Sequence, residues 1–159
     1  MSGLLSAVKI EHRLGVKAPA SIVWEILSDV PGWTAWSTIY SKASGVIGFG
    51  ERLKLEVAMP GQPPLEIEPV IFEWEPHEVI HWRLKSMAGL IENVRFLEVE
   101  PLSETGCIFS NGEIYGGLMG PSRAAIKQRG VIRQGFQALG EAMRDRAEAL
   151  WRERCGGTT

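Results

Sequence analysis

Residues 122–154 read SRAAIKQRGVIRQGFQALGEAMRDRAEALWRER and form the longest regular pattern in the chain. Apolar side chains recur there at three- and four-residue steps: Ile126, Ile132, Phe136, Leu139, Met143, Ala147, Leu150 and Trp151. Such a stripe is typical of an amphipathic helix that buries one face. The segment therefore predicts one long helix near the C-terminus, followed by a disordered tail over residues 155–159.

Upstream of this helix, the chain reads as a succession of strands interrupted by turn residues. Apolar and polar residues alternate over residues 4–17, and two short helices follow, one after Pro19 and one within WTAWS. Six further strands are predicted at 38–45, 51–58, 64–74, 77–85, 91–101 and 105–115. Their short connections favour antiparallel pairing. We predict an α+β fold in which a curved antiparallel sheet of about seven strands is covered by the long helix.

Three glycines lie inside the predicted helix, at Gly130, Gly135 and Gly140. Each costs about 1 kcal/mol of helix stability relative to alanine. Repeated interior glycines indicate that something approaches the helix closely. Close packing of a strand is the favoured interpretation, and room for a ligand is the alternative.

Composition restricts the classes of partner. The chain has 159 residues, which we interpret as a single domain over residues 1–159, with 45% hydrophobic residues and a net charge of -2. This charge gives no basic footprint for nucleic acid. We expect no integral membrane contact, because no apolar run is long enough to cross a bilayer and the N-terminus does not resemble a signal peptide. Cys107 and Cys155 fit free thiols in a cytoplasmic protein, either a monomer or a homodimer.

Five segments together resemble a known superfamily, in the correct order: APASIVWEILSDVPGWTAWS, GERLKLEV, VIFEWEPHEVIHWRL, FLEVEPLSETGCIFSNGEIYGG and QGFQALGEAMRDRAEAL. They are similar to the SRPBCC, or START-like, superfamily, and most similar to its polyketide cyclase/dehydratase-like branch. The resemblance covers residues 8–151 and implies the helix-grip fold, with a deep apolar cavity between sheet and helix. The superfamily includes lipid and hormone carriers, aromatase/cyclases, oxygenase domains and chaperone activators, so the fold alone does not select a function.

Two tryptophans, Trp33 and Trp36, follow the first predicted helix. In the resembled family this segment lies near the wall or mouth of the cavity. An indole offers a large apolar surface and one N–H donor, which suits either a core or a cavity edge. A core role keeps equal weight for either residue, and Trp36 is the better candidate for the cavity wall.

Two predicted strands carry polar residues on an otherwise apolar face. Alternation places Asn93, Arg95, Asn111 and Glu113 on the same face as Leu97, Val99, Phe109 and Tyr115. Buried charges must pair or meet a ligand, because burying either alone is costly. An ion pair between Arg95 and Glu113 is the favoured interpretation. The alternative is a catalytic pair, with Arg95 polarising a carbonyl and Glu113 acting as the base.

Histidines give little support to an enzyme. Related chains often carry histidine at the positions of Arg95 and Asn111, and arginine cannot exchange a proton near neutral pH. The departure favours binding over acid–base catalysis. His12 is interpreted as a satisfied core residue, and His77 and His81 lack further ligands at the spacing of a metal site. No cofactor and no metal are expected.

These observations predict a protein that binds a small apolar molecule, lipid-like or aromatic, inside a cavity. The predicted lining is Trp36, Trp82, Leu97, Phe109, Tyr115, Phe136, Leu139 and Met143, with Asn93, Arg95, Asn111 and Glu113 orienting polar groups. Two alternatives remain open. One is a cyclase or dehydratase acting on a polyketide-like substrate, and the other is a protein-interaction module that uses the outer face of the sheet.

Overall fold

The computed structural model of the protein describes residues 7–86, 90–117, 121 and 123–156. Its main sheet is antiparallel, with strands in the order β1 (Val8–Val16), β8 (Gly106–Gly116), β7 (Ile91–Ser103), β6 (Val79–Ser86) and β5 (Val70–Glu75). A smaller antiparallel sheet has the order β2 (Tyr40–Ser44), β3 (Lys54–Val57) and β4 (Leu65–Ile67). The helices of the described residues are α2 (Ala20–Ser28), α3 (Trp33–Trp36), α4 (Arg123–Lys127) and α5 (Arg129–Gly156).

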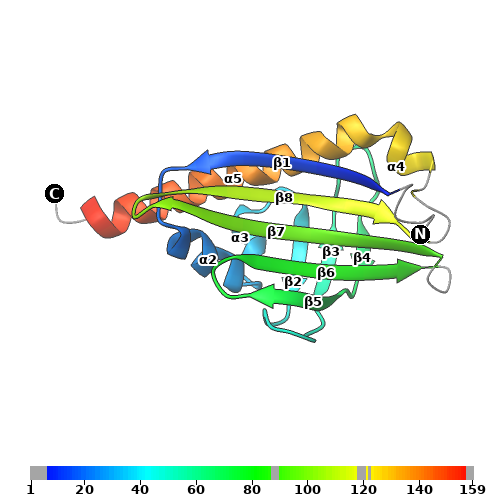
Figure 1. Ribbon diagram of the computed structural model, residues 1–159, viewed down its shortest axis with the longest axis horizontal. Helices are drawn as coiled ribbons and strands as arrows, with labels where there is room; N and C mark the ends of the chain where they lie inside the picture. The colour runs from blue at the N-terminus through cyan, green and yellow to red at the C-terminus, as the bar shows by residue number, and fades with distance from the viewer. Residues whose placement is uncertain (1–6, 87–89, 118–120, 122, 157–159) are drawn as a thin grey trace.

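The long helix α5 runs along the main sheet (Figure 1), with α4 at one end of the molecule and α2 beside the C-terminal part of α5. Polar contacts fix α5 at this second end. The guanidinium of Arg154 pairs with the carboxylate of Glu25 on α2, and the backbone N–H of Lys17 donates to the Glu148 carboxylate at 2.9 Å. The prediction of an α+β fold with antiparallel strands, two short helices after the first strand and a long C-terminal helix is confirmed.

The strand predicted over residues 64–74 is wrong, because it consists of two strands in different sheets. β4 ends at Ile67 and β5 begins at Val70, so the chain changes sheet at Glu68 and Pro69. A proline has no N–H for a sheet ladder, which makes this position unsuited to the middle of a strand. The described residues therefore form eight strands in two sheets instead of about seven in one.

The helix predicted over residues 122–154 differs at both ends. It is divided into α4 and α5 at Gln128, where backbone hydrogen bonds from Gln128 to Ala124 and from Ile132 to Gln128, both 2.9 Å, bridge the interruption. At the C-terminal end, α5 includes Cys155 and Gly156, which the predicted tail contained. Residues 122 and 157–159, and residues 4–6 of the first predicted strand, lie outside the described residues.

The alternation predicted for the two longest strands is confirmed. The register sets Asn93 opposite Tyr115, Arg95 opposite Glu113, Leu97 opposite Asn111 and Val99 opposite Phe109. The side chains of Arg95, Leu97, Val99, Phe109 and Asn111 are all buried. This face of β7 and β8 is therefore the inner face, and its polar side chains Arg95 and Asn111 point toward the interior.

Two of the three helical glycines mark close packing. A Cβ atom built at Gly140 would lie 3.0 Å from Cδ2 of Leu14 and 3.2 Å from Nδ1 of His12. At Gly135 it would lie 2.8 Å from Cε of Met59. Close packing is thus confirmed at both positions, whereas a Cβ at Gly130 would meet nothing within 4 Å.

In the described part of the chain, no helix combines the length and the apolar composition needed to cross a membrane.

Candidate functional site

A cavity of about 520 Å³ lies between the two sheets and the N-terminal part of the helical pair α4–α5. The small sheet and its loops contribute Ile39, Tyr40, Val57, Met59, Gln62, Pro63, Pro64, Leu65 and Ile67. The main sheet contributes Trp82, Leu84, Asn93, Arg95, Glu113 and Tyr115, and the helices contribute Ala124, Ala125, Gln128, Ile132 and Phe136. A mostly apolar wall with a few polar groups, at this volume, is typical of a small-molecule site.

Half of the predicted lining residues line this cavity: Trp82, Asn93, Arg95, Glu113, Tyr115 and Phe136. The other half lie elsewhere: Trp36, Leu97, Phe109, Asn111, Leu139 and Met143. Their positions have a common cause, because the cavity occupies only the part of the interior near α4. Toward the other end, the inner face of the sheet packs directly on α2 and α5, and the side chains there form solid core.

The two tryptophans have different positions, and the preference for Trp36 as a wall residue is not supported. Trp36 is half-buried against the core and does not line the cavity. Trp33 is fully buried, and its indole Nε1 donates to the carbonyl of Leu27 at 3.0 Å. The Trp33 ring stacks on Trp82 and tilts against Tyr40, with centroid distances of 6.1 and 5.2 Å. Trp33 therefore supports the cavity wall from behind.

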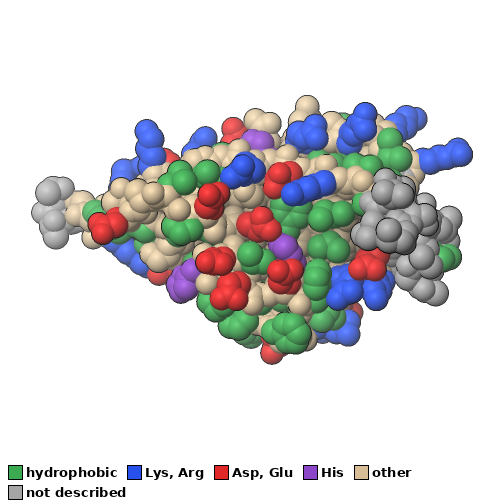
Figure 2. Space-filling view, in the orientation of Figure 1, with side chains coloured by type: hydrophobic (Ala, Val, Ile, Leu, Met, Phe, Trp, Pro, Cys, Tyr) green, Lys and Arg blue, Asp and Glu red, His purple; other side chains and the backbone are tan. Residues whose placement is uncertain are grey.

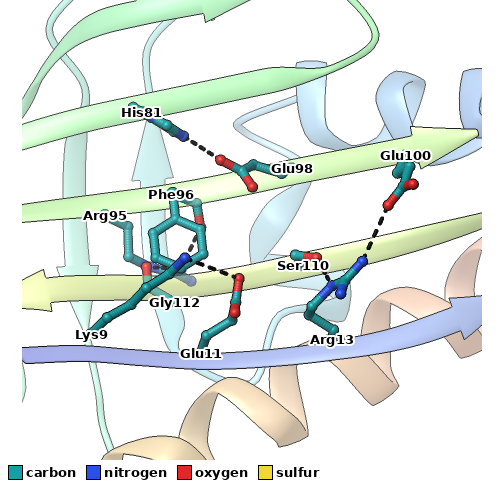
Figure 3. Close-up of polar contacts among 10 residues, drawn as sticks. All are labelled: Lys9, Glu11, Arg13, His81, Arg95, Phe96, Glu98, Glu100, Ser110 and Gly112. Atoms are coloured by element: carbon teal, nitrogen blue, oxygen red, sulfur yellow. Dashed lines mark hydrogen bonds and ion pairs between the residues drawn. The ribbon is translucent and has the colours of Figure 1, made fainter.

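Arg95 is the buried cation of the site, with only 3% of its surface exposed. Its Nε donates to the hydroxyl of Tyr40 at 3.0 Å, and its Nη2 donates to Oδ1 of Asn111 at 3.1 Å. Its Nη1 donates to the carbonyls of Phe96 and Gly112, at 3.0 and 2.9 Å (Figure 3). Four of the five guanidinium N–H donors thus have neutral acceptors, which holds the head group in one orientation.

The predicted ion pair between Arg95 and Glu113 is wrong. Although the two residues face each other in the register, no ion pair within the described ranges joins them. The guanidinium turns instead toward Tyr40 and Asn111. Asn111 in turn links Arg95 to helix α5, because its Nδ2 donates to the backbone carbonyl of Phe136 at 3.0 Å.

Glu113 lines the cavity without an arginine partner. Burial raises the pKa of its carboxyl to about 7, against the opposing effects of the nearby Arg95 charge and a hydrogen bond that Tyr115 donates. Burial also raises the pKa of the Tyr115 hydroxyl, which stays protonated and able to donate. A carboxyl of this pKa changes its charge near neutral pH. The inference that absent histidines weaken acid–base chemistry therefore overlooked what desolvation does to a carboxylate.

Sequence reasoning missed Tyr40, which lines the cavity and accepts the hydrogen bond of Arg95. Burial raises the pKa of its hydroxyl above the ordinary value. The interpretation of His12 as a satisfied core residue is also wrong, since its Nδ1 atom is buried without a hydrogen-bond partner in the described structure. It lies beside Gly140, outside the cavity.

The histidine on the outer face of the main sheet contacts carboxylates. His81 lies between Glu73, 3.1 Å from Nδ1, and Glu98, 2.7 Å from Nε2. Across the described ranges, no group of three or more His, Cys, Asp or Glu side chains could hold a metal ion.

Comparison with solved structures finds the same fold in several proteins. The Zhui aromatase/cyclase from Streptomyces sp. R1128 is 20% identical, with a TM-score of 0.72 over 92% of this chain and 95% of that chain. A START superfamily protein from Mycobacterium smegmatis is 15% identical, with a TM-score of 0.69 over 89% and 98%. A norcoclaurine synthase from Thalictrum flavum is 17% identical, with a TM-score of 0.65 over 91% and 96%.

No match to a curated protein was found. Residues 7–144 match the family described as "Polyketide cyclase / dehydrase and lipid transport". This match spans most of the chain and includes every residue that lines the cavity. The chain therefore belongs to the polyketide cyclase/dehydrase and lipid transport family.

Proposed function

We propose that the protein binds a small, mainly apolar ligand, lipid-like or aromatic, with a polar group at one end. The observation that carries the proposal is the arrangement of the cavity wall. Asn93 and Tyr115 are opposite each other in the β7–β8 register, and so are Arg95 and Glu113, so the four form one polar patch. Around this patch the wall is mostly apolar, and such a division orients a ligand with one polar end.

The polar patch suits a neutral polar group such as a hydroxyl or a carbonyl. The positive charge of Arg95 is already opposed by Glu113 when that carboxyl is ionised, and most of its donors are occupied. The Asn93 amide can donate and accept, and a Glu113 carboxyl with a pKa of about 7 can do either according to its protonation. A fully charged head group would need to displace these contacts.

The test measures binding of the uncharged fluorophore N-phenyl-1-naphthylamine. We expect saturable binding that is weakened at least about tenfold by Leu84→Trp, which adds volume to the cavity wall. Leu102→Trp is the matched control, because Leu102 is exposed and away from the cavity. Trp36→Ala should leave affinity unchanged. Equal affinity of the Leu84→Trp protein would contradict the proposal, and native mass spectrometry of the purified protein would identify a retained ligand.

An enzyme is the second candidate, and one observation favours it. A carboxyl with a pKa of about 7 faces a cavity beside the hydroxyl of Tyr115, which is a suitable pair for moving a proton at neutral pH. The fold is shared with an aromatase/cyclase. If Glu113 abstracts a proton, Glu113→Gln should abolish turnover of a polyketide-like substrate while fluorophore affinity is kept. If the protein only binds, no turnover is present to lose.

A protein-interaction role for the outer face of the main sheet finds less support. Arg13 on β1 pairs with Glu100 on β7 at 3.2 Å, and the charged side chains of this face point toward one another (Figure 3). Exposed pairs of this kind are ordinary features of a solvated surface.

A further inference from the structure

The cavity opens to solvent at its α4 end, where the lining residues Pro63, Pro64, Leu65 and Ala124 are exposed. Three large exposed apolar side chains lie on the elements at this opening. Leu65 of β4 is 62% exposed, Ile126 of α4 is 42% exposed and Val131 of α5 is 40% exposed. Leu65 itself lines the cavity, and Ile126 follows two alanines, Ala124 and Ala125, that also line it. An exposed apolar residue needs no explanation alone, but several around one opening mark a surface that meets another apolar phase.

The loop before β4 and the start of α5 are in contact, so these side chains belong to one rim. The amide Nε2 of Gln62 donates to Oε1 of Gln128 at 3.0 Å, and both residues line the cavity. A Cβ built at Gly61 would lie 3.9 Å from Cγ1 of Val131. The small sheet and the helical pair therefore meet beside the opening.

Basic residues accompany the apolar ones on the helical side. Arg123, Lys127, Arg129 and Arg133 are all exposed, and the sequence contains no Asp or Glu between Glu113 and Glu141. Figure 2 shows Lys and Arg side chains gathered along the edge that α4 and the first turns of α5 form. Within the described ranges, none of these four residues has an ion-pair partner.

The acidic residue on the other side of the opening faces away. Leu65 and Ile67 line the cavity, whereas the intervening Glu66 does not and lines a separate groove along β2, β3 and β4. There its carboxylate lies 4.0 Å from Nζ of Lys42. The rim thus combines exposed apolar side chains with positive charge.

We propose that this rim, formed by Leu65, Arg123, Ile126, Lys127, Arg129, Val131 and Arg133, docks on the surface of an anionic lipid bilayer. Lysine and arginine next to apolar side chains are what an interfacial membrane site requires, since the charges meet lipid head groups while the apolar groups enter the boundary with the acyl chains. An acidic protein would match the charge but would leave the protruding Leu65 and Ile126 without an apolar phase. Docking in this orientation turns the cavity opening toward the bilayer.

The docking surface goes beyond the binding of a ligand in the cavity, and it is tested without one. The purified full chain is sedimented with vesicles of phosphatidylcholine alone and with vesicles containing one quarter phosphatidylglycerol, at low salt. We expect binding to the anionic vesicles only. Arg129→Glu/Arg133→Glu should weaken it by at least about thirtyfold, from the usual contribution of a basic residue near an anionic surface. Leu65→Glu should also weaken it.

Matched controls come from the other end of the molecule. Leu102 is 63% exposed, like Leu65, and lies away from the cavity, so Leu102→Glu should leave vesicle binding unchanged. Arg146 and Arg152 are exposed on the same helix α5, so Arg146→Glu/Arg152→Glu makes the same change in net charge at a distant position. Circular dichroism melting confirms that each variant is folded.

Several outcomes would overturn the proposal. They are no sedimentation with anionic vesicles, equal binding to neutral vesicles, or equal losses in the rim variants and their controls. Association of the rim with an acidic protein in the absence of any vesicle binding would also overturn it. The fluorophore titration remains independent, because Arg129 and Arg133 do not line the cavity. An Arg129→Glu/Arg133→Glu variant that loses vesicle binding while still binding N-phenyl-1-naphthylamine separates this proposal from that of the cavity.

Discussion

The two ends of the protein interior are built differently although the same helix and the same sheet run through both. Toward the C-terminal end of α5, the helix packs directly on β1 and α2, and side chains such as Phe109, Leu139 and Met143 are fully buried. Toward α4, the helix and the main sheet enclose a cavity with the small sheet. The packed end gives the fold its stability, whereas the open end leaves space and polar groups for a ligand.

The difference between the two ends follows from which strand side chains contact α5. At the packed end, Gly140 lets Leu14 and His12 of β1 approach the helix axis. At the open end, Gln128 and Ile132 are separated from the strands by the cavity. Arg95 stands at the boundary, because it lines the cavity and also joins Asn111, which is bonded to the helix. The buried guanidinium of Arg95 therefore lies where the solid core ends and the cavity begins.

Substitution of Arg95 should have the largest effect on stability, because Arg95 connects the solid core to the cavity wall. We expect Arg95→Met to lower the free energy of unfolding by about 3–5 kcal/mol, since it leaves the buried Tyr40 hydroxyl and the Asn111 carbonyl oxygen without their donor. Urea denaturation measures the change.

A second substitution distinguishes this account from an ion pair. Glu113→Leu in the Arg95→Met background should restore little stability, because the lost hydrogen bonds go to neutral acceptors. Recovery of most of the loss in the double variant would show strong coupling, and the two side chains would then act as a pair after all.

Glu113 should make the open end sensitive to pH. Its pKa is raised from 4.5 to about 7, so the folded state holds a proton that the unfolded state releases between these values. The stabilising contribution of the protonated Glu113 is therefore fully present below about pH 4.5 and is lost as the pH rises through 7. At about 1.4 kcal/mol per pKa unit the full loss is about 3–4 kcal/mol, and Glu113→Gln should recover most of it at pH 8 and nothing at pH 4.

Unfolding curves between pH 4 and 8 measure this dependence. Glu25→Gln is the control, because the hydrogen bond from Arg154 lowers the pKa of that surface carboxyl, a shift in the opposite direction from that of Glu113. A wild-type protein whose stability rises from pH 5 to 8 more than that of Glu113→Gln would show that Glu113 is stabilised in its ionised form.

At the packed end, steric crowding should limit substitution. We expect Gly140→Leu to lower the free energy of unfolding by about 1–3 kcal/mol, because even its Cβ would lie 3.0 Å from Leu14 and 3.2 Å from His12. Fluorophore affinity should change little, since Gly140 does not line the cavity. A variant as stable as the wild type would show that β1 can move away from α5 at this point.

The sequence predicted which face of each strand points inward, but it did not predict which part of that face lines the cavity. Period-two alternation identified the inner face of β7 and β8, so Arg95, Glu113 and Tyr115 were predicted correctly as inward residues. The same pattern holds for Leu97 and Phe109, which lie in solid core, because alternation carries no information about where a cavity begins. That depends on distant partners such as the loop before β4.

The partners of Arg95 could not be predicted for a similar reason. Adjacency in a register brings Arg95 and Glu113 together, but the guanidinium bonds Tyr40, which is distant in the chain and belongs to the other sheet. The prediction of one strand over residues 64–74 concealed that second sheet. Once β4 and β5 are separated at Pro69, the cavity has a wall that the sequence pattern had assigned elsewhere.

The smallest expected effect has the opposite sign and lies at the open end. Gly130 is in α5 like Gly140, but a Cβ there would meet nothing within 4 Å, so alanine fits without a clash. Because alanine favours a helix over glycine and restricts the unfolded chain, Gly130→Ala should raise the free energy of unfolding by about 0.5–1 kcal/mol. Urea denaturation of Gly130→Ala, Gly140→Ala and the wild type compares the two ends directly. If both alanine variants change the free energy of unfolding in the same direction, helix propensity alone explains the effect of each substitution. The difference in packing between the two ends of α5 would then have no influence on it.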